Sequence, residues 1–451
     1  MTSAVPDLKT LEETSPSDTL RAFFGRTRAE YLEAVRNGRG KEWTVVMGNE
    51  AGDLDSLACA VAYAWYLSDV QQTPAVALVQ TPRGDLHLRA ENAHALALAG
   101  VSLDELLCLD DVLPPSSSSP FPSTTFALVD HNRLNAQFSA DNSAARVVAI
   151  IDHHADEGLH TDADPRIVTQ GVGSCAALVA LFLQDKCAEK IPPELAVLLL
   201  SAIVVDTGGM VPGGKAVEVD RRAAVFLASR CTLASRSPNL AASSLALRSP
   251  AAIPPLHKSE AIQKLNGTLQ MKKNSVAHLG VRDLLRRDYK EYAHTPAFAP
   301  SRELLIGLAS VPLGLATLVP RDEAQFVNDT KHYMDERGLT ALGVLTSFRD
   351  DKKPGKGGKG KHRREQLWVV HASDDVQSEL ARRLFRGLEE NDVLQLKKRK
   401  WEKIGADPAV WDRSGGAFGE GWRVQAWKQK NADATRKATA PIVKAIVEGR
   451  E

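Results

Sequence analysis

The chain has 451 residues, more than one hydrophobic core usually covers, and this length predicts two domains. With 43% hydrophobic and 25% charged residues, the composition is that of an ordinary globular protein and excludes disordered, collagen-like and disulfide-stapled classes. Its 56 basic and 56 acidic residues cancel, so the net charge gives no reason to expect nucleic acid or an anionic membrane as a partner.

The cysteines and the N-terminus indicate a cellular compartment. The five cysteines are widely spaced and form no CxxC pair, which predicts reduced, buried thiols of an intracellular protein. The first residues show no secretory signal, and no stretch reaches the ~18 consecutive apolar residues of a membrane span. We therefore expect a cytoplasmic protein, and a monomer, with neither membrane nor nucleic acid as a partner.

From about residue 43 to residue 207 the sequence alternates short apolar runs with longer helical patterns, as α/β proteins do. Almost wholly apolar runs bounded by turn residues predict buried parallel strands at residues 44–47, 126–129 and 147–151. Longer segments that are apolar nearly all round predict helices packed against that sheet at residues 56–67, 174–183 and 194–205.

A stretch of mixed Ser, Ala, Arg and Pro at residues 236–255 is the predicted linker between a first domain, residues 1–235, and a second, residues 256–451. New strand and helix patterns follow it, at residues 304–306, 340–345, 366–370, 378–389 and 434–447. The predicted fold class is α/β, with a mainly parallel sheet in the N-terminal domain and a smaller C-terminal α/β domain.

A lysine- and glycine-rich insertion occupies residues 352–364. Its composition favours a solvated, disordered hairpin tip over an arm that gathers polyanions or a nuclear localisation signal. The sequence alone does not give it a role.

Four clusters place carboxylate or imidazole groups just after an apolar run, where open α/β sheets bind ligands. They occupy residues 48–56, 129–132, 151–154 and 205–208. A single aspartate after a strand is more often a helix cap or a turn former. Several aspartates that converge at one sheet edge repel strongly unless cations neutralise them, so the four clusters together predict a metal site.

Oxygen ligands with one or two imidazoles suit Mg²⁺, Mn²⁺ or Co²⁺ better than a structural zinc site, which favours thiolates. Two such ions about 4 Å apart can share a hydroxide that attacks phosphorus in line. The sequence has no GxSxG elbow, no P-loop and no well-placed GxGxxG to compete with this interpretation. Phosphoryl transfer is therefore the predicted chemistry.

In order and spacing, the four clusters resemble the four motifs of the DHH phosphoesterase superfamily, which is named after the tripeptide at Asp152, His153 and His154. The resemblance implies a set of ligands for two divalent ions, namely Asp53, Asp55, Asp130, His153 and Asp206. It further implies that Asp130 bridges the ions, that His154 faces the phosphate, and that Asp130, His153 and His154 form the catalytic group.

Asn49 departs from one branch of that superfamily. Family II pyrophosphatases begin the first motif with histidine, whereas asparagine is typical of fungal-type exopolyphosphatases and of prune-like proteins. An amide oxygen is a harder and weaker ligand than imidazole, so Mg²⁺ is expected to serve better than Mn²⁺ at that position. We also place Asn49 among the residues that face the substrate.

Two basic segments, residues 286–292 and 435–439, resemble the phosphate-binding segments of the DHH-associated second domain. The candidates for substrate binding are Arg287, Lys290, Arg436 and Lys437, joined by Arg83 and Lys215 from the first domain. On their residue types alone, helix-borne arginines and lysines are more often solvated surface charges.

The resemblance implies an exopolyphosphatase of the fungal type, in which the domains close over inorganic polyphosphate and a metal-held hydroxide releases its terminal orthophosphate. The alternatives are an inorganic pyrophosphatase, a prune-like nucleotide phosphodiesterase and a non-catalytic polyphosphate-binding regulator. Asn49 argues against the first, the intact Asp152-His153-His154 against the second, and the presence of Asp130 and Asp206 against the third.

Overall fold

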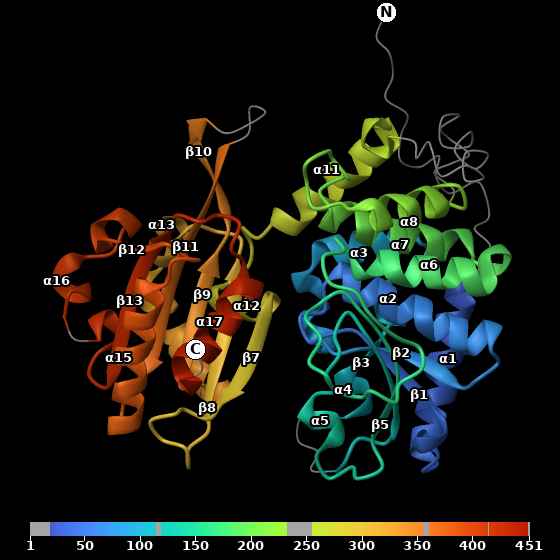
Figure 1. Ribbon diagram of the computed structural model, residues 1–451, viewed down its shortest axis with the longest axis horizontal. Helices are drawn as coiled ribbons and strands as arrows, with labels where there is room; N and C mark the ends of the chain where they lie inside the picture. The colour runs from blue at the N-terminus through green and yellow to red at the C-terminus, as the bar shows by residue number, and fades with distance from the viewer. Residues whose placement is uncertain (1–18, 114–118, 232–254, 355–359, 414, 450–451) are drawn as a thin grey trace, which may run out of the picture. The chain divides into compact units, whose positions relative to one another are not determined.

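The computed structural model describes residues 19–113, 119–231, 255–354, 360–413 and 415–449 (Figure 1). The chain divides into two compact units, Met1–Ser275 and Val276–Glu451. Apart from Pro255, the predicted linker lies outside the described residues. The predicted second domain begins at residue 256, whereas the structure packs the helix Glu260–Asn274 on the first unit.

The first unit is built on a six-stranded sheet in the order β3-β2-β1-β4-β5-β6, with every neighbouring pair parallel. Its strands are β1 (Thr44–Met47), β2 (Ala75–Val79), β3 (Leu107–Cys108), β4 (Thr125–Val129), β5 (Arg146–Asp152) and β6 (Arg166–Val168). The chain builds outward from β1 in one direction and then from β4 in the other. At such a reversal the loops after the two central strands diverge, which leaves a crevice at their carboxyl ends.

Side chains that alternate along each strand point to opposite faces of the sheet, and helices cover both faces. Val46 and Val129 belong to one core, whereas Val45 and Leu128 belong to the other. The helices are α1 (Thr19–Arg36), α2 (Leu54–Trp65), α3 (Ala90–Leu98), α4 (Leu109–Val112), α5 (Ala136–Ser139), α6 (Cys175–Cys187), α7 (Pro193–Asp206), α8 (Glu218–Ala228) and α11 (Glu260–Asn274).

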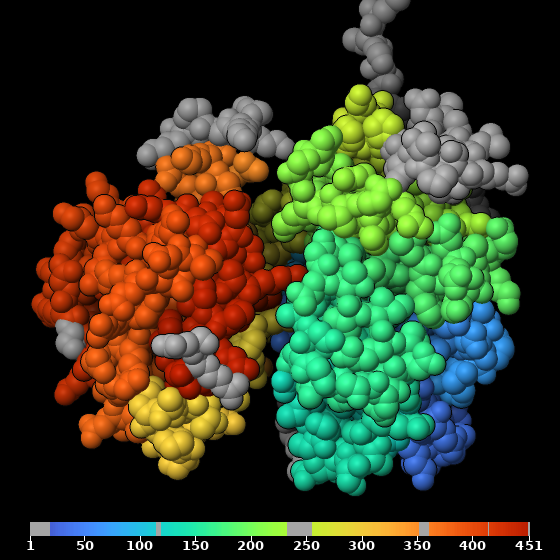
Figure 2. All heavy atoms as spheres, in the orientation of Figure 1, coloured from blue at the N-terminus to red at the C-terminus, as the bar shows by residue number. Residues whose placement is uncertain are grey.

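The strands and helices predicted in the first region are confirmed, with shifts of a few residues at their ends. One of the four clusters follows a helix rather than a strand, in agreement with the helix predicted at residues 194–205. The apolar run before Asp206 belongs to α7, so this aspartate reaches the site from the C-terminal end of a helix. The central strands β1 and β4 are buried. The face of the first unit shown in Figure 2 is formed mainly by residues coloured teal and green.

The second unit contains a mixed sheet in the order β12-β13-β11-β9-β8-β7, with β10 paired to β11. Its strands are β7 (Tyr289–His294), β8 (Leu304–Val311), β9 (Ala341–Thr346), β10 (Phe348–Pro354), β11 (Gly360–His371), β12 (Leu396–Lys398) and β13 (Trp422–Gln429). Its helices are α12 (Val281–Arg287), α13 (Leu315–Leu318), α14 (Glu323–Arg337), α15 (Asp375–Glu390), α16 (Pro408–Trp411) and α17 (Arg436–Glu448). The predicted second α/β region is confirmed.

The lysine- and glycine-rich insertion lies on the antiparallel pair β10 and β11, and the residues between them, 355–359, lie outside the described part of the chain. None of the helices in the described ranges is both long enough and apolar enough to cross a bilayer.

Candidate metal centre

The first motif is the tight connection between β1 and α2. A Cβ atom on Gly48 would lie 2.4 Å from Cβ of Ser56, so only glycine lets the end of β1 pass this close to the helix. Asp53 caps α2, because its Oδ1 accepts from the backbone nitrogen of Ser56 at 3.1 Å. Asp55 follows in the first helical turn, where it is buried.

Asp130 follows β4 and is buried, with a left-handed backbone at φ 61°. Its backbone nitrogen donates to the carbonyl of Ile151 at 2.9 Å, which ties the ends of β4 and β5 together. Its carboxylate oxygen Oδ2 accepts from Nδ2 of Asn49 at 2.8 Å and from Oγ of Ser56 at 2.7 Å. The other oxygen, Oδ1, accepts no hydrogen bond from the described residues, although it is buried.

Two imidazoles from the end of β5 face that free oxygen. Nε2 of His153 lies 3.3 Å from Oδ1 of Asp130, and Nδ1 of His154 lies 3.6 Å from it. Nδ1 of His153 lies 3.0 Å from the carbonyl of Val172, which only a donor can approach, so Nε2 of the neutral ring is an acceptor. An acceptor nitrogen and a carboxylate oxygen this close are stable together only with a proton or a cation between them.

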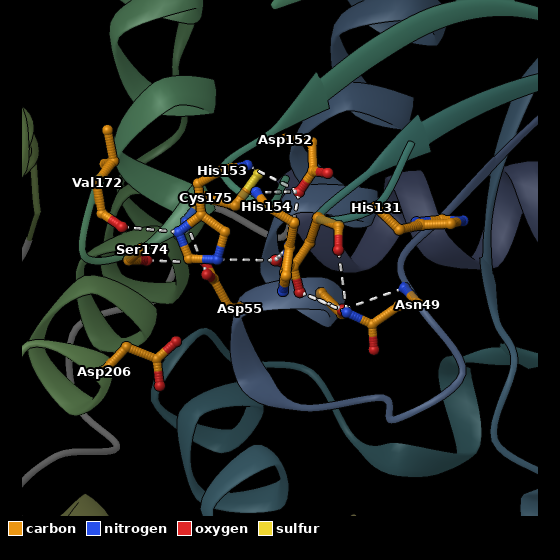
Figure 3. A network of polar contacts seen from close by, with 12 residues as sticks. Asn49, Asp55, His131, Asp152, His153, His154, Val172, Ser174, Cys175 and Asp206 are labelled. Atoms are coloured by element: carbon orange, nitrogen blue, oxygen red, sulfur yellow. Dashed lines mark hydrogen bonds and ion pairs between the residues drawn. The ribbon is translucent and has the colours of Figure 1, made fainter. Parts of the chain in front are cut away.

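Asp152 orients the second imidazole. Its Oδ1 lies 2.7 Å from Nδ1 of His154, and its Oδ2 accepts from Nδ2 of Asn132 at 2.6 Å. In metal sites such a carboxylate fixes the ring position and the tautomer. Figure 3 shows both imidazoles directed into one network, while the neighbouring His131 points away from it.

Asp55 stabilises the N-terminus of α6. Its two oxygens accept from Oγ of Ser174 at 2.8 Å and from the backbone nitrogens of Cys175 at 2.7 Å and Ala176 at 2.8 Å. A carboxylate at this position satisfies backbone donors that have no partner within the helix and interacts favourably with the helix dipole. The same hydrogen bonds hold Asp55 beside the other acidic residues of the site.

Asp206, the last residue of α7, carries its carboxylate into the same region (Figure 3). Its Oδ1 lies 3.3 Å from Nζ of Lys273 on α11. Sequence reasoning did not identify Lys273, nor the supporting hydroxyl of Ser56, because neither belongs to a recognisable metal-ligand pattern.

The electrostatics of the site reflect its crowded acids. Burial, and then the negative charges of Asp130 and Asp206, raise the pKa of Asp55. Burial and the same two charges raise the pKa of Asp53. For Asp130 burial also opposes ionisation, but the close approach of His153 and the positive charge that both imidazoles can carry outweigh it and hold the pKa of Asp130 below the ordinary value.

These observations fit a divalent metal. Ligand atoms of Asp130, His153 and His154 all lie within 4.8 Å of one another. A ligand set of carboxylate oxygens and imidazole nitrogens, without a thiolate, suits Mn²⁺, Co²⁺ or Mg²⁺. The structure therefore brings Asp130 and His153 together with His154. Asp53 and Asp55 interact electrostatically with Asp130 and Asp206, and the binding of ions by these residues remains a prediction.

The predicted basic residues of the first unit differ in their surroundings. Arg83 donates to the carboxylate of Asp111, with its Nη2 at 2.5 Å from Oδ2, and its backbone nitrogen donates to Asp110. This engagement argues against Arg83 as a phosphate ligand, although the prediction itself stays untested. Lys215 is exposed in the loop after α7.

Among the predicted basic residues of the second unit, Arg436 at the start of α17 contacts the segment that carries Arg287 and Lys290. Nη2 of Arg436 lies 2.9 Å from Oδ1 of Asp288, and its Nη1 donates to the carbonyl of the same residue at 2.8 Å. Asp288 stands between Arg287, which ends α12, and β7, which carries Lys290. Thr435 caps α17 through the backbone nitrogen of Lys437.

Two protein-family models match the chain. The model of the DHH family, N-terminal domain, matches residues 43–203, which include the motifs around Asp55, Asp130 and His153. The model of the DHHA2 domain matches residues 267–446. The chain carries a DHH family N-terminal domain and a DHHA2 domain. The resemblance inferred from its motifs is thereby confirmed.

Several relatives of this DHH protein have names that refer to phosphoanhydride substrates. It is 32% identical to the "Putative exopolyphosphatase" of Schizosaccharomyces pombe, over 58% of this chain and 63% of that protein. It is 29% identical to "Exopolyphosphatase PRUNE1" of Rattus norvegicus, over 40% of each chain. It is 30% identical to the "Manganese-dependent inorganic pyrophosphatase" of Methanocaldococcus jannaschii, over 36% of this chain and 47% of that protein. The matches thus span less than two thirds of these relatives' own lengths.

Proposed function

We propose that this DHH protein is a divalent-metal-dependent phosphohydrolase that releases terminal orthophosphate from inorganic polyphosphate. The observation that carries the proposal is the buried Oδ1 of Asp130, which accepts no hydrogen bond from the described residues and faces two imidazoles. The relatives named as exopolyphosphatases support polyphosphate as the substrate.

The residues proposed to hold the ions are Asp53, Asp55, Asp130, His153 and Asp206. Divalent ions bound there would neutralise phosphate charge and make a water molecule more nucleophilic at neutral pH. Removing them would leave the acidic residues to repel one another, as the raised pKa values of Asp53 and Asp55 indicate.

The protein's own groups fix this site before any substrate arrives. Asn49 and Ser56 donate to one oxygen of Asp130, so the other oxygen is directed toward the imidazoles. In the structure Asn49 therefore acts through its amide nitrogen on Asp130, and Ala51 donates to its amide oxygen. Its proposed contact with substrate would add to this positioning role.

His154 is proposed to contact the phosphate. Asp152 holds its Nδ1, which leaves Nε2 available to a phosphate oxygen. In the reaction the oxygen of water bonds to the terminal phosphorus while the bridging P–O bond breaks. The water proton is released, and the products are orthophosphate and a polyphosphate shorter by one residue.

The second unit is proposed to bind phosphate groups through Arg287, Lys290, Arg436 and Lys437. Asp288 already orients the guanidinium of Arg436, which reduces the conformational freedom lost when it binds an oxyanion. The N-terminus of α17 adds backbone donors and a favourable dipole. Guanidinium groups recognise phosphate through paired, charge-assisted hydrogen bonds.

The test is orthophosphate release from long-chain polyphosphate, pyrophosphate and a cyclic nucleotide, each with Mg²⁺, Mn²⁺ or a chelator. Metal-dependent release from polyphosphate, with little from pyrophosphate, is expected. A preference for pyrophosphate or for the nucleotide would agree with the proposed metal centre but contradict polyphosphate as the substrate. No phosphate release from any of the three compounds, with intact metal binding, would favour a non-catalytic polyphosphate-binding regulator.

A further inference from the structure

Helix α11 presents a polar stripe to the last motif of the metal centre. The helix packs on α7 and α3, and it buries Ile262 and Leu269 in the core of the first unit. Asn266, Gln270 and Lys273 are spaced by four and three residues, so they lie along one side of the helix. Polar residues at a helix contact call for an explanation beyond apolar packing.

Each residue of the stripe meets the segment 205–209, which contains Asp206. Nε2 of Gln270 donates to the carbonyl of Val205 at 2.7 Å. The amide of Asn266 lies against Gly209, where an added Cβ would be 3.0 Å from Nδ2. The stripe therefore fixes α11 on the C-terminal end of α7, which places Nζ of Lys273 at 3.3 Å from Oδ1 of Asp206.

The charge of Lys273 acts on more than one acidic residue. Its side chain is 32% exposed, so water only partly screens it. Besides Asp206 it interacts electrostatically with Asp53, the N-cap of α2, and with Glu91 on α3, while Arg89 repels it. A single ammonium group thus partly neutralises two proposed metal ligands that come from different helices.

We propose that Lys273 is a positioning residue that holds Asp206 in the metal-free protein and competes with divalent ions for that carboxylate. This inference rests on the metal site of the proposed function, and it is independent of the substrate. A divalent ion that takes Asp206 displaces the ammonium group, which stays nearby and repels the ion. Lys273 therefore stabilises the metal-free protein and weakens the binding of the metal.

The test compares Lys273→Met with Lys264→Met, which removes the same charge from an exposed position on the same helix. Mn²⁺ binding to the metal-free proteins is measured by calorimetry. Lys273→Met is expected to bind Mn²⁺ about twofold to fivefold more tightly, the range of a partly screened ion pair, and Lys264→Met to match the wild type. With chelator present, only Lys273→Met should melt at a lower temperature.

The charge-conserving variant Lys273→Arg should keep the affinity of the wild type for Mn²⁺. Equal affinity of Lys273→Met and Lys264→Met, or weaker binding by Lys273→Met, would overturn the role of Lys273. Failure of the wild type to bind Mn²⁺ at all would overturn the metal site itself. Because neither readout involves hydrolysis, the choice of polyphosphate as substrate is not at issue in this test.

Discussion

The two units treat charge in opposite ways. The first unit buries like charges, and Asp55 and Asp130 stay in place only because a helix terminus, an amide, a hydroxyl and two imidazoles hold them. In the second unit Arg436 pairs with Asp288 within its own fold. The metal centre is therefore incomplete without a cation, whereas Arg436 of the basic segment already has an anionic partner. Removing metal should destabilise the first unit, whereas raising the salt concentration should weaken the ion pair of the second unit.

The strongest test of this contrast is Asp130→Asn. The change removes a charge that both imidazoles face, while asparagine tolerates the left-handed backbone at this position. Phosphate release is expected to fall by about a thousandfold or more, with Mn²⁺ affinity strongly reduced. Circular dichroism and the binding of polyphosphate to the second unit should stay unchanged. Near-normal turnover would contradict the metal-dependent mechanism.

A smaller effect is expected at the basic segment. Arg436→Ala should raise KM for polyphosphate by about 10- to 100-fold, the loss expected for a charge-assisted hydrogen bond, and leave Mn²⁺ affinity unchanged. Arg386→Ala, which removes an exposed arginine from α15, is the control. Equal kinetics of the two variants would remove Arg436 from the substrate site.

Two glycines sharpen the comparison at the level of packing. Gly48→Ala would drive a Cβ into α2 and should lower the free energy of unfolding by about 1–3 kcal/mol. Gly338 ends α14 of the second unit at φ 64° and has open space around it. Gly338→Ala should therefore lower the free energy of unfolding by about 1 kcal/mol through backbone strain alone. Urea unfolding measures both, and a smaller loss at Gly48 would contradict the tight approach.

The smallest expected effect concerns pH. Burial and neighbouring charges raise the pKa values of Asp53 and Asp55, so their contribution to stability is present below the unfolded pKa and is lost as pH rises through the folded values. Asp130 has a lowered pKa and titrates only in more acidic solution. The melting temperature gained from Mn²⁺ should therefore grow as the pH rises through the raised pKa values of Asp53 and Asp55. A gain independent of pH would refute this account.

The sequence predicted what local patterns determine. The runs that became β1, β4 and β5 are apolar and bounded by turns, and the motifs after them have a recognisable order. It did not predict that Lys273 lies beside Asp206, because 67 residues separate them and only the packing of α11 brings them together. The sequence also does not show that α11 packs with the first unit, because the pattern of a helix does not reveal which core buries its apolar face.

The parallel order of the first sheet also has a consequence for how the protein folds. The chain must complete long crossovers before β1, β4 and β5 lie side by side, and contacts between such distant segments form slowly. Asn49, Asp130 and His153 meet only when those three strands are aligned. Capture of a divalent ion during refolding should therefore mark the completion of the sheet, and metal uptake should be a late kinetic phase rather than a nucleus.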